Sequence, residues 1–136
     1  MEKHSVYRSS SIVHSELVEK VQSKRISTGE HLGIVSDLGK GLDIEGLRIH
    51  QEVLYPGRRS SPLHRHLSRW ELVYVLSGTP SVRINKEATI LEEGELVSFS
   101  PKNNDYHMIF NDSDEIARLL VVSVGSDDDE VLYMPD

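Results

Sequence analysis

Residues 62–76, PLHRHLSRWELVYVL, give the clearest indication of the fold in this sequence. Its second half, from Trp70 to Leu76, is apolar on both faces apart from Glu71, which predicts a strand covered by protein on each side. An unpaired carboxylate is costly to bury in such a strand and therefore needs a partner. A metal ion would be such a partner, so Glu71 is a candidate functional residue.

Two histidines come shortly before Glu71. His64 and His66 are separated by one residue, so on a strand both imidazoles project to the same face and can share one ion. The alternative is a partly exposed histidine pair on a polar strand. His66 and Glu71 are five positions apart, and because this number is odd, one continuous strand would place them on opposite faces. The spacing therefore predicts a turn at residues 67–69, with Glu71 facing inward from the start of the next strand.

The chain beyond Gly46 consists of short apolar or alternating segments separated by turn residues, which is typical of an all-β sandwich or barrel. Leu47, Ile49 and Val53 share one face of a strand, and a hairpin turn is expected at residues 85–87. We expect about seven or eight strands, spaced about ten residues apart. This spacing fits a closed jelly roll, which leaves no exposed sheet edges.

A single domain is expected from the length of 136 residues, which is enough to bury an independent core. Residues 46–136 are predicted to form the β domain. Residues 1–45 are predicted to form a short N-terminal extension that is irregular or partly helical and packs on the barrel. Within this extension, residues 15–24 are compatible with one or two helical turns, with Ser15 as the N-cap.

The composition excludes several classes of partner. The chain has no cysteine, so a metal would have to be bound by nitrogen and oxygen ligands. A net charge of -7, without a basic cluster longer than Arg58-Arg59, argues against nucleic acid, whose phosphates require a coherent positive surface. The absence of a long apolar run predicts a soluble protein with no membrane partner, and the absence of an apolar secretory signal favours the cytoplasm. The acidic run at residues 127–130 is expected to be solvated.

Two motifs resemble those of the cupin superfamily, in the same order along the chain. The first consists of Gly57, His64, His66, Glu71 and Gly78. The second consists of Gly94, Pro101, His107 and Asn111. One position departs from the pattern, because Asn103 stands where many cupins carry glycine. More narrowly, residues 60–66, 72–78 and 131–136 resemble a group of small single-domain microbial cupins of unassigned function.

The resemblance implies a double-stranded β-helix, or jelly-roll barrel, that often forms a homodimer. It also implies one divalent metal ion per subunit, held by His64, His66, Glu71 and His107. Iron, manganese, zinc and nickel all suit three imidazoles and a carboxylate, so the donor set leaves the identity of the metal open. Such a donor set leaves one or two coordination positions for a small-molecule ligand in the barrel.

Three functional hypotheses are open for these four residues. The first is a metal-dependent enzyme of the dioxygenase, isomerase or epimerase type that acts on a small oxygen-bearing molecule, since a bound metal can polarise an oxygen donor. The second is a non-catalytic cupin that binds a small ligand such as a sugar or a carboxylate. The third has no metal, and its histidines are core residues satisfied by hydrogen bonds.

Acid–base groups beside the metal would distinguish the enzyme from the binding protein. The candidates are His50, Arg59, Tyr74 and Tyr106, and none of them stands out as a general base. Tyr74 shares its strand face with Trp70 and Leu72, opposite Glu71. The apolar outer faces of residues 70–76 and 118–124 are larger than a monomer of this size should expose, which predicts a homodimer.

Overall fold

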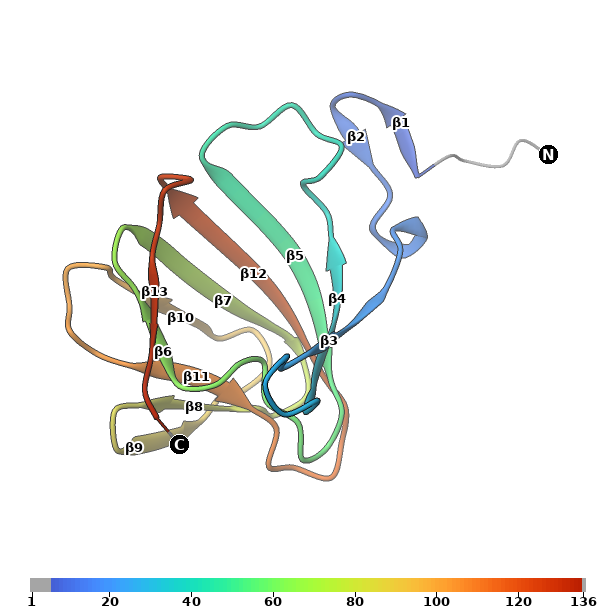
Figure 1. Cartoon of the computed structure of the whole chain (residues 1–136). Helices are drawn as coiled ribbons and strands as arrows, with labels where there is room; N and C mark the ends of the chain where they lie inside the picture. The colour runs from blue at the N-terminus through green and yellow to red at the C-terminus, as the bar shows by residue number, and fades with distance from the viewer. Residues whose placement is uncertain (1–5, 136) are drawn as a thin grey trace.

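The computed structural model describes residues 6–135, and antiparallel strands form its framework (Figure 1). The elements in chain order are β1 (Tyr7–Ser9), β2 (Ile12–Val13), the 3-10 helix η1 (Ser15–Leu17), β3 (Val21–Lys24), β4 (His31–Asp37), β5 (Leu47–Leu54), β6 (His64–His66), β7 (Arg69–Ser77), β8 (Ser81–Ile84), β9 (Glu87–Ile90), β10 (Leu96–Phe99), β11 (His107–Phe110), β12 (Ala117–Gly125) and β13 (Val131–Tyr133). Within residues 6–135, no helix has the length and hydropathy needed to cross a membrane.

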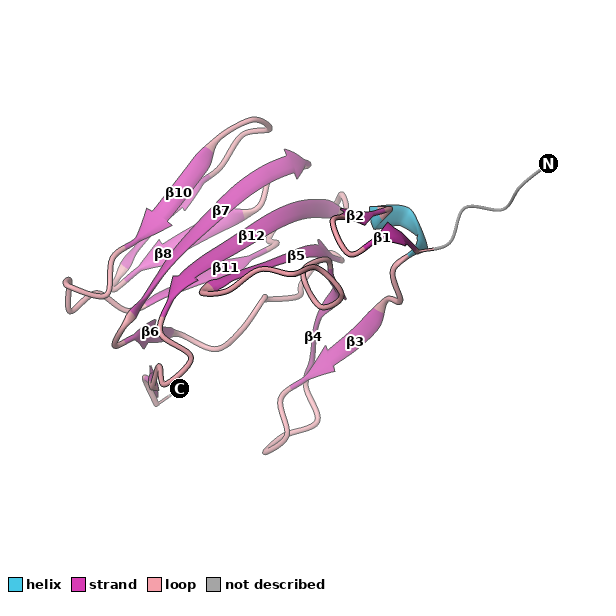
Figure 2. Ribbon diagram, turned by 90° about the horizontal axis from the view of Figure 1, so that it is seen from above, coloured by secondary structure: helices cyan, strands magenta, loops and turns pink. Residues whose placement is uncertain are grey.

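Two sheets make up the barrel. The larger has the strand order β10-β7-β12-β5-β4-β3, and the smaller has the order β13-β6-β11-β8-β9. In Figures 1 and 2 the smaller sheet lies across one face of the larger, and the β1–β2 hairpin stands at one side. This arrangement is an all-β jelly roll, which confirms the predicted fold class.

The core lies between the two sheets and follows from the alternation of side chains along the strands. On β12, Leu119 and Val121 are buried and pack with Val75 of β7, while Val82 of β8 and Ile109 of β11 contribute from the smaller sheet. One face of each central strand therefore supplies the core, and the other faces outward.

The outward face of β7 is less covered than the sequence predicted. Val73 and Val75 are buried on the inner face, but Leu72 and Tyr74 on the outer face are only half-buried and Trp70 is exposed. A single chain therefore buries one face of this apolar strand, and the outer face remains accessible. The prediction that Tyr74 lies on the outer face is confirmed.

Strand β5 turns its polar face inward. Leu47, Ile49 and Val53 share the outer, half-buried face, whereas Glu52 and Leu54 are buried on the inner face. The inner face of a barrel strand is normally the more apolar one. Polar inner positions on β5 therefore indicate that this part of the interior is a cavity rather than packed core.

The N-terminal residues contribute strands to the larger sheet. Strand β4 pairs with β5 from Ile34 with Val53 to Asp37 with His50, and β3 pairs with β4. The predicted boundary after residue 45 falls in the loop between β4 and β5. The helical turn expected within residues 15–24 is limited to η1, because residues 21–24 are extended as β3 and hydrogen-bonded to β4.

Two turns show how local sequence sets the backbone. Asn85 has a φ of 54°, which suits the two-residue connection between β8 and β9, and it is the only non-glycine residue with positive φ among residues 6–135. The hairpin expected at residues 85–87 is therefore present. Because Asn103 has no positive φ, its turn does not require the glycine that many cupins carry there.

Candidate metal centre

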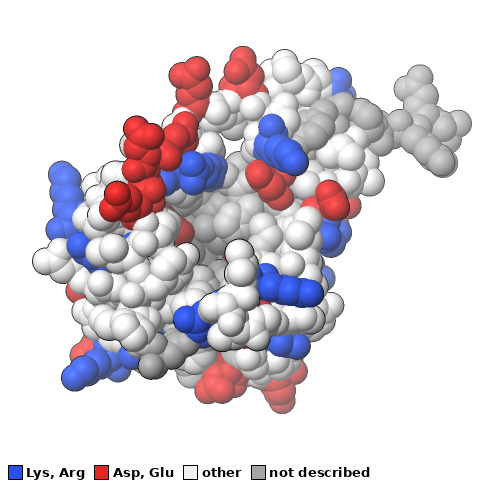
Figure 3. Space-filling model, in the orientation of Figure 1, with Lys and Arg blue, Asp and Glu red and all other residues white. Residues whose placement is uncertain are grey.

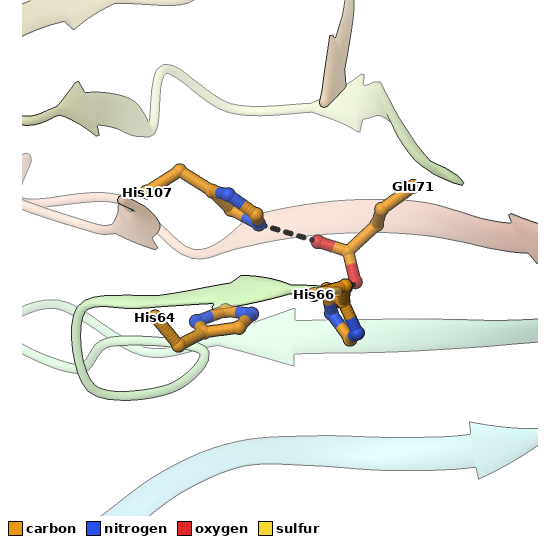
Figure 4. A group of neighbouring side chains, drawn as sticks. All are labelled: His64, His66, Glu71 and His107. Atoms are coloured by element: carbon orange, nitrogen blue, oxygen red, sulfur yellow. Dashed lines mark hydrogen bonds and ion pairs between the residues drawn. The ribbon is translucent and has the colours of Figure 1, made fainter. Parts of the chain in front are cut away.

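The four predicted ligand residues come together from three strands. His64 and His66 lie on β6, Glu71 lies on β7, and His107 opens β11 opposite His64. A short turn joins β6 to β7, as the odd spacing required. One ligand atom from each residue lies within 4.8 Å of the others, so the group could hold a metal ion. Figure 4 shows the three rings gathered around the carboxylate of Glu71.

His64 is fixed by its Nδ1 atom. This atom lies 2.9 Å from the carbonyl oxygen of Pro62 and 2.9 Å from the hydroxyl of Ser61. Because a carbonyl oxygen only accepts, Nδ1 carries the hydrogen and donates it. The lone pair of His64 is then on Nε2, the atom available to a metal.

His66 is held in the same way by Asp129. Its Nδ1 lies 2.7 Å from Asp129 Oδ2, and Oδ1 of Asp129 accepts from the backbone N–H of Ser68 at 2.7 Å and from its hydroxyl at 3.0 Å. The Nε2 atom of His66 is buried and lies 3.3 Å from Glu71 Oε2, yet it has no hydrogen-bond partner among the described residues. A buried nitrogen without a partner, facing a carboxylate, fits a place for a cation.

His107 completes the group. Its Nε2 lies 3.1 Å from Glu71 Oε1, and its ring stacks on Phe99 with the centroids 3.6 Å apart and the planes at 2°. The residue is only 3% exposed. Stacking on Phe99 therefore fixes the plane of the imidazole that faces Glu71.

Burial and the neighbouring groups shift the pKa values of three of the four residues. Burial, together with the nearby His107, lowers the pKa of His64 to about 4, so this ring is neutral near pH 7. Burial would raise the pKa of Glu71, but the hydrogen bond from His107 and the close approach of His66 outweigh it and lower the pKa. The close approach of the Glu71 carboxylate raises the pKa of His66, and a bound metal would have to displace the proton on that ring. The site thus stabilises positive charge between His66 and Glu71, the charge that a divalent ion would supply.

The donor set fits a borderline divalent metal. Three imidazole nitrogens and one carboxylate oxygen suit iron, manganese, zinc or nickel, and the chain has no thiolate to compete. The reading in which hydrogen bonds alone satisfy the histidines leaves the buried Nε2 of His66 unaccounted for. The geometry therefore favours the metal hypothesis over the core-histidine hypothesis.

The cluster opens into a cavity of about 250 Å³. Val73, Ile109 and Val121 line its apolar wall, while Val131 and Tyr133 from β13 contribute on another side. The wall away from Glu71 is polar, with His50, Glu52, Ser60 and Ser61. Figure 3 shows acidic side chains gathered on the surface over the loops that follow β4 and β12. The cavity is small and holds both apolar and polar groups, as ligand pockets do.

The other sequence candidates lie in different places. Arg59 forms a two-pronged ion pair with Glu30, at 2.9 and 2.8 Å. Tyr106 lies beside the guanidinium of Arg65, 6.0 Å from its ring centroid. His50 alone among the four acid–base candidates lines the cavity. The structure therefore keeps His50 as a candidate.

Two functional residues were missed from the sequence. Asp129 lies in the acidic run expected to be solvated, but its side chain is only 5% exposed and contacts His66. Glu52 was not among the predicted site residues, although it is buried and lines the cavity. The alternation along Leu47–Leu54 does place Glu52 on the same face as His50, which is the one signal that the sequence offered.

Comparison with known proteins shows the family and the fold. A model of the cupin domain matches residues 50–123. A solved structure from Acidithiobacillus ferrooxidans, provisionally assigned as a sugar phosphate isomerase, shares 30% identity, with a TM-score of 0.69 over 74% of this chain and 64% of that one. The chain thus spans less than two thirds of the length of that relative. A comparison with curated protein sequences found no match.

Two further solved structures share the fold. A sugar phosphate isomerase of the cupin superfamily from Silicibacter pomeroyi superposes with a TM-score of 0.80 at 21% identity, over 89% of this chain and 80% of that one. A protein from Thermotoga maritima, predicted to be an oxalate decarboxylase, superposes with a TM-score of 0.70 at 17% identity, over 85% of this chain and 99% of that one. Because the family model covers more than half of the sequence, the chain belongs to the cupin family.

Proposed function

We propose that this chain is a metal-dependent enzyme that acts on a small oxygen-bearing molecule bound in the barrel. One divalent ion of iron, manganese, zinc or nickel would be held by His64, His66, Glu71 and His107. The observation that carries the proposal is the approach of four ligand atoms to within 4.8 Å of one another, with the buried Nε2 of His66 left without a hydrogen-bond partner among the described residues.

The chain's own residues would prepare the site for this chemistry. When bound, the metal would supply a Lewis acid that polarises an oxygen of the ligand. Asp129 and Pro62 orient His66 and His64 through their Nδ1 atoms. Val73, Ile109 and Val121 give the cavity an apolar wall, beside which electrostatic interactions are stronger than in bulk water.

An isomerase or epimerase acting on a hydroxylated carbonyl compound is the reaction type we favour. Support comes from the structure at 30% identity whose provisional assignment is sugar phosphate isomerase. An isomerase moves a proton between neighbouring carbons, and an epimerase removes and returns a proton at one carbon, so both need acid–base groups beside the metal. Among the acid–base candidates, the cavity offers His50. The alternative is a non-catalytic cupin that binds a sugar or a carboxylate.

A metal-by-metal activity screen tests this proposal. The protein would be loaded separately with each of the four ions and incubated with aldoses and ketoses in deuterated water. We expect one metal form to incorporate solvent deuterium, and His64→Ala to abolish this. Oxygen consumption in a parallel run would indicate the dioxygenase type instead. Ligand binding without turnover in every metal form would favour the non-catalytic alternative.

We also propose that the protein forms a homodimer through the outer face of its larger sheet. Trp70 on β7, Leu96 on β10 and Val124 on β12 are 45%, 57% and 40% exposed in the single chain. These strands are neighbours in the sheet, so their exposed apolar side chains form one surface. Burial of such a surface against a second copy would remove it from water.

A further inference from the structure

A second polar cluster lies in the same cavity as the candidate metal centre. Glu52 on β5 is 2% exposed and lines the cavity with His50 from the same strand. The hydroxyl of Ser60 donates to Glu52 Oε2 at 2.9 Å, and His50 Nε2 lies 3.3 Å from the same oxygen. A nearly fully buried carboxylate is costly without a strong cationic partner, so its retention calls for a reason.

Strand β4 makes room for this carboxylate at Gly33. A Cβ atom on Gly33 would overlap Oε1 of Glu52 and would lie 2.6 Å from its Cγ and 2.7 Å from its Cδ. The backbone does not itself demand glycine here, because Gly33 is not among the glycines with positive φ. Gly33 therefore leaves the space that the Glu52 side chain occupies. A larger residue on β4 would pack there only if Glu52 moved.

Glu52 is too far along the sheet to join the metal ligands. Leu119 of β12 pairs with Glu52 on one side and with Val75 on the other, whereas Glu71 pairs with Ser123. The backbones of the two glutamates are thus separated by two strand spacings, roughly 10 Å, and by four residue rises, roughly 13 Å. Both side chains nevertheless line one cavity. Glu52 therefore faces the part of a ligand that is remote from the metal.

The chemistry of this far wall selects what can bind there. An ionised carboxylate only accepts hydrogen bonds, and the hydroxyl of Ser60 already donates its hydrogen to Glu52, so both groups offer acceptors to a ligand. A carboxylate or phosphate of a ligand would meet like charge at Glu52, in a setting where water screens poorly. A hydroxyl group would donate to it instead. The far wall is therefore built for hydroxyl groups and against anions.

We infer that Glu52 is a specificity residue that binds a hydroxyl group at the end of the ligand remote from the metal. The ligand class is then a small polyhydroxylated molecule whose far end is uncharged. This inference rests on the proposed function for the metal end of the ligand. It excludes ligands that carry a carboxylate at the end remote from the metal, which the fold alone would allow.

The test compares three probes with the same carbon chain by isothermal titration calorimetry on the metal-loaded protein. D-xylose has no charge, D-xylonate has a carboxylate at one end, and D-xylarate has a carboxylate at both ends. We expect D-xylose or D-xylonate to bind at least about tenfold more tightly than D-xylarate. Equal or tighter binding of D-xylarate, or no binding of either of the other two probes at tens of millimolar, would overturn the inference.

Glu52→Gln isolates the role of the charge. The glutamine carbonyl can still accept from Ser60, so the variant should fold and unfold at the same or a higher temperature than the wild type, because no charge is buried. We expect its discrimination against D-xylarate to fall to within about threefold, since the side chain can now donate to a carboxylate. Unchanged discrimination against D-xylarate would contradict the inference. A lower unfolding temperature than that of the wild type would show that Glu52 has a structural role instead.

Two further variants complete the design. Gly33→Ala displaces the Glu52 carboxylate without changing it and should lose discrimination as Glu52→Gln does. Glu87→Gln, on the exposed strand β9, removes a glutamate far from the cavity and should behave as the wild type. The metal content of each protein is measured in parallel. Absence of metal in the wild type would contradict the proposed function, whereas normal metal content with unchanged discrimination in Glu52→Gln would contradict this inference alone.

Discussion

At the scale of single residues, Asp129 is the side chain that would orient a metal ligand. Its carboxylate accepts the Nδ1 hydrogen of His66 and two hydrogens of Ser68. Such outer contacts typically contribute about 10- to 100-fold to metal affinity. We therefore expect Asp129→Asn to weaken metal binding by this factor and leave the fold intact, as measured by competition with a chelator. The matched control is Asp128→Asn, at an exposed neighbour. Equal affinity in the two variants would contradict this role.

Residue spacing and the family resemblance predicted the four ligand residues but not their supports. The same-face rule for His64 and His66 and the odd spacing to Glu71 were enough to place the turn between β6 and β7. Asp129 is 63 positions from His66 and reaches it only because β13 pairs with β6. No local pattern carries that contact, so it could not be predicted.

At the scale of elements, Arg69 at the start of β7 forms hydrogen bonds to the end of β12 and to the residue before β5. It is 1% exposed and donates to the carbonyl oxygens of Ser123, Gly125 and Ser126 and to that of Gly46. These contacts hold the end of β12 against the start of β7, next to the turn that positions Glu71. The guanidinium group therefore stabilises this end of the larger sheet.

We expect Arg69→Met to lower the free energy of unfolding by about 3–5 kcal/mol, because the methionine keeps apolar bulk but leaves several buried carbonyl oxygens without a donor. Urea denaturation followed by tryptophan fluorescence measures the change. Arg118→Met, at an exposed position on β12, is the control and should change the stability by less than about 0.5 kcal/mol. Similar losses in both variants would show that Arg69 has no special part.

Two segments differ from the sequence prediction, each for its own physical reason. Strand β3 and the segment before it are short and lie at the edge of the larger sheet, so pairing with β4 decides their conformation more than local preference does. The inner face of β5 is polar because it lines a cavity, which reverses the usual rule for barrel strands. The long central strands β7 and β12, by contrast, lie where their apolar patterns predicted strands.

At the scale of the whole molecule, the apolar outer face of the larger sheet determines the expected assembly. We expect sedimentation to give twice the single-chain mass of 15.4 kDa. Val122 pairs with Leu72 and Ile49 on this face, so Val122→Glu should give a monomer, because a charge cannot be buried there without a partner. A monomeric wild type at every concentration tested would contradict the predicted homodimer.

The metal content of the purified protein shows whether His64, His66, Glu71 and His107 bind an ion. Metal content would be measured by inductively coupled plasma mass spectrometry for the wild type and for a His64→Ala, His107→Ala double variant whose folding is checked by circular dichroism. We predict close to one ion of iron, manganese, zinc or nickel per wild-type chain, and none in the double variant. A wild type that stays without metal after reconstitution with each of these ions would contradict the account.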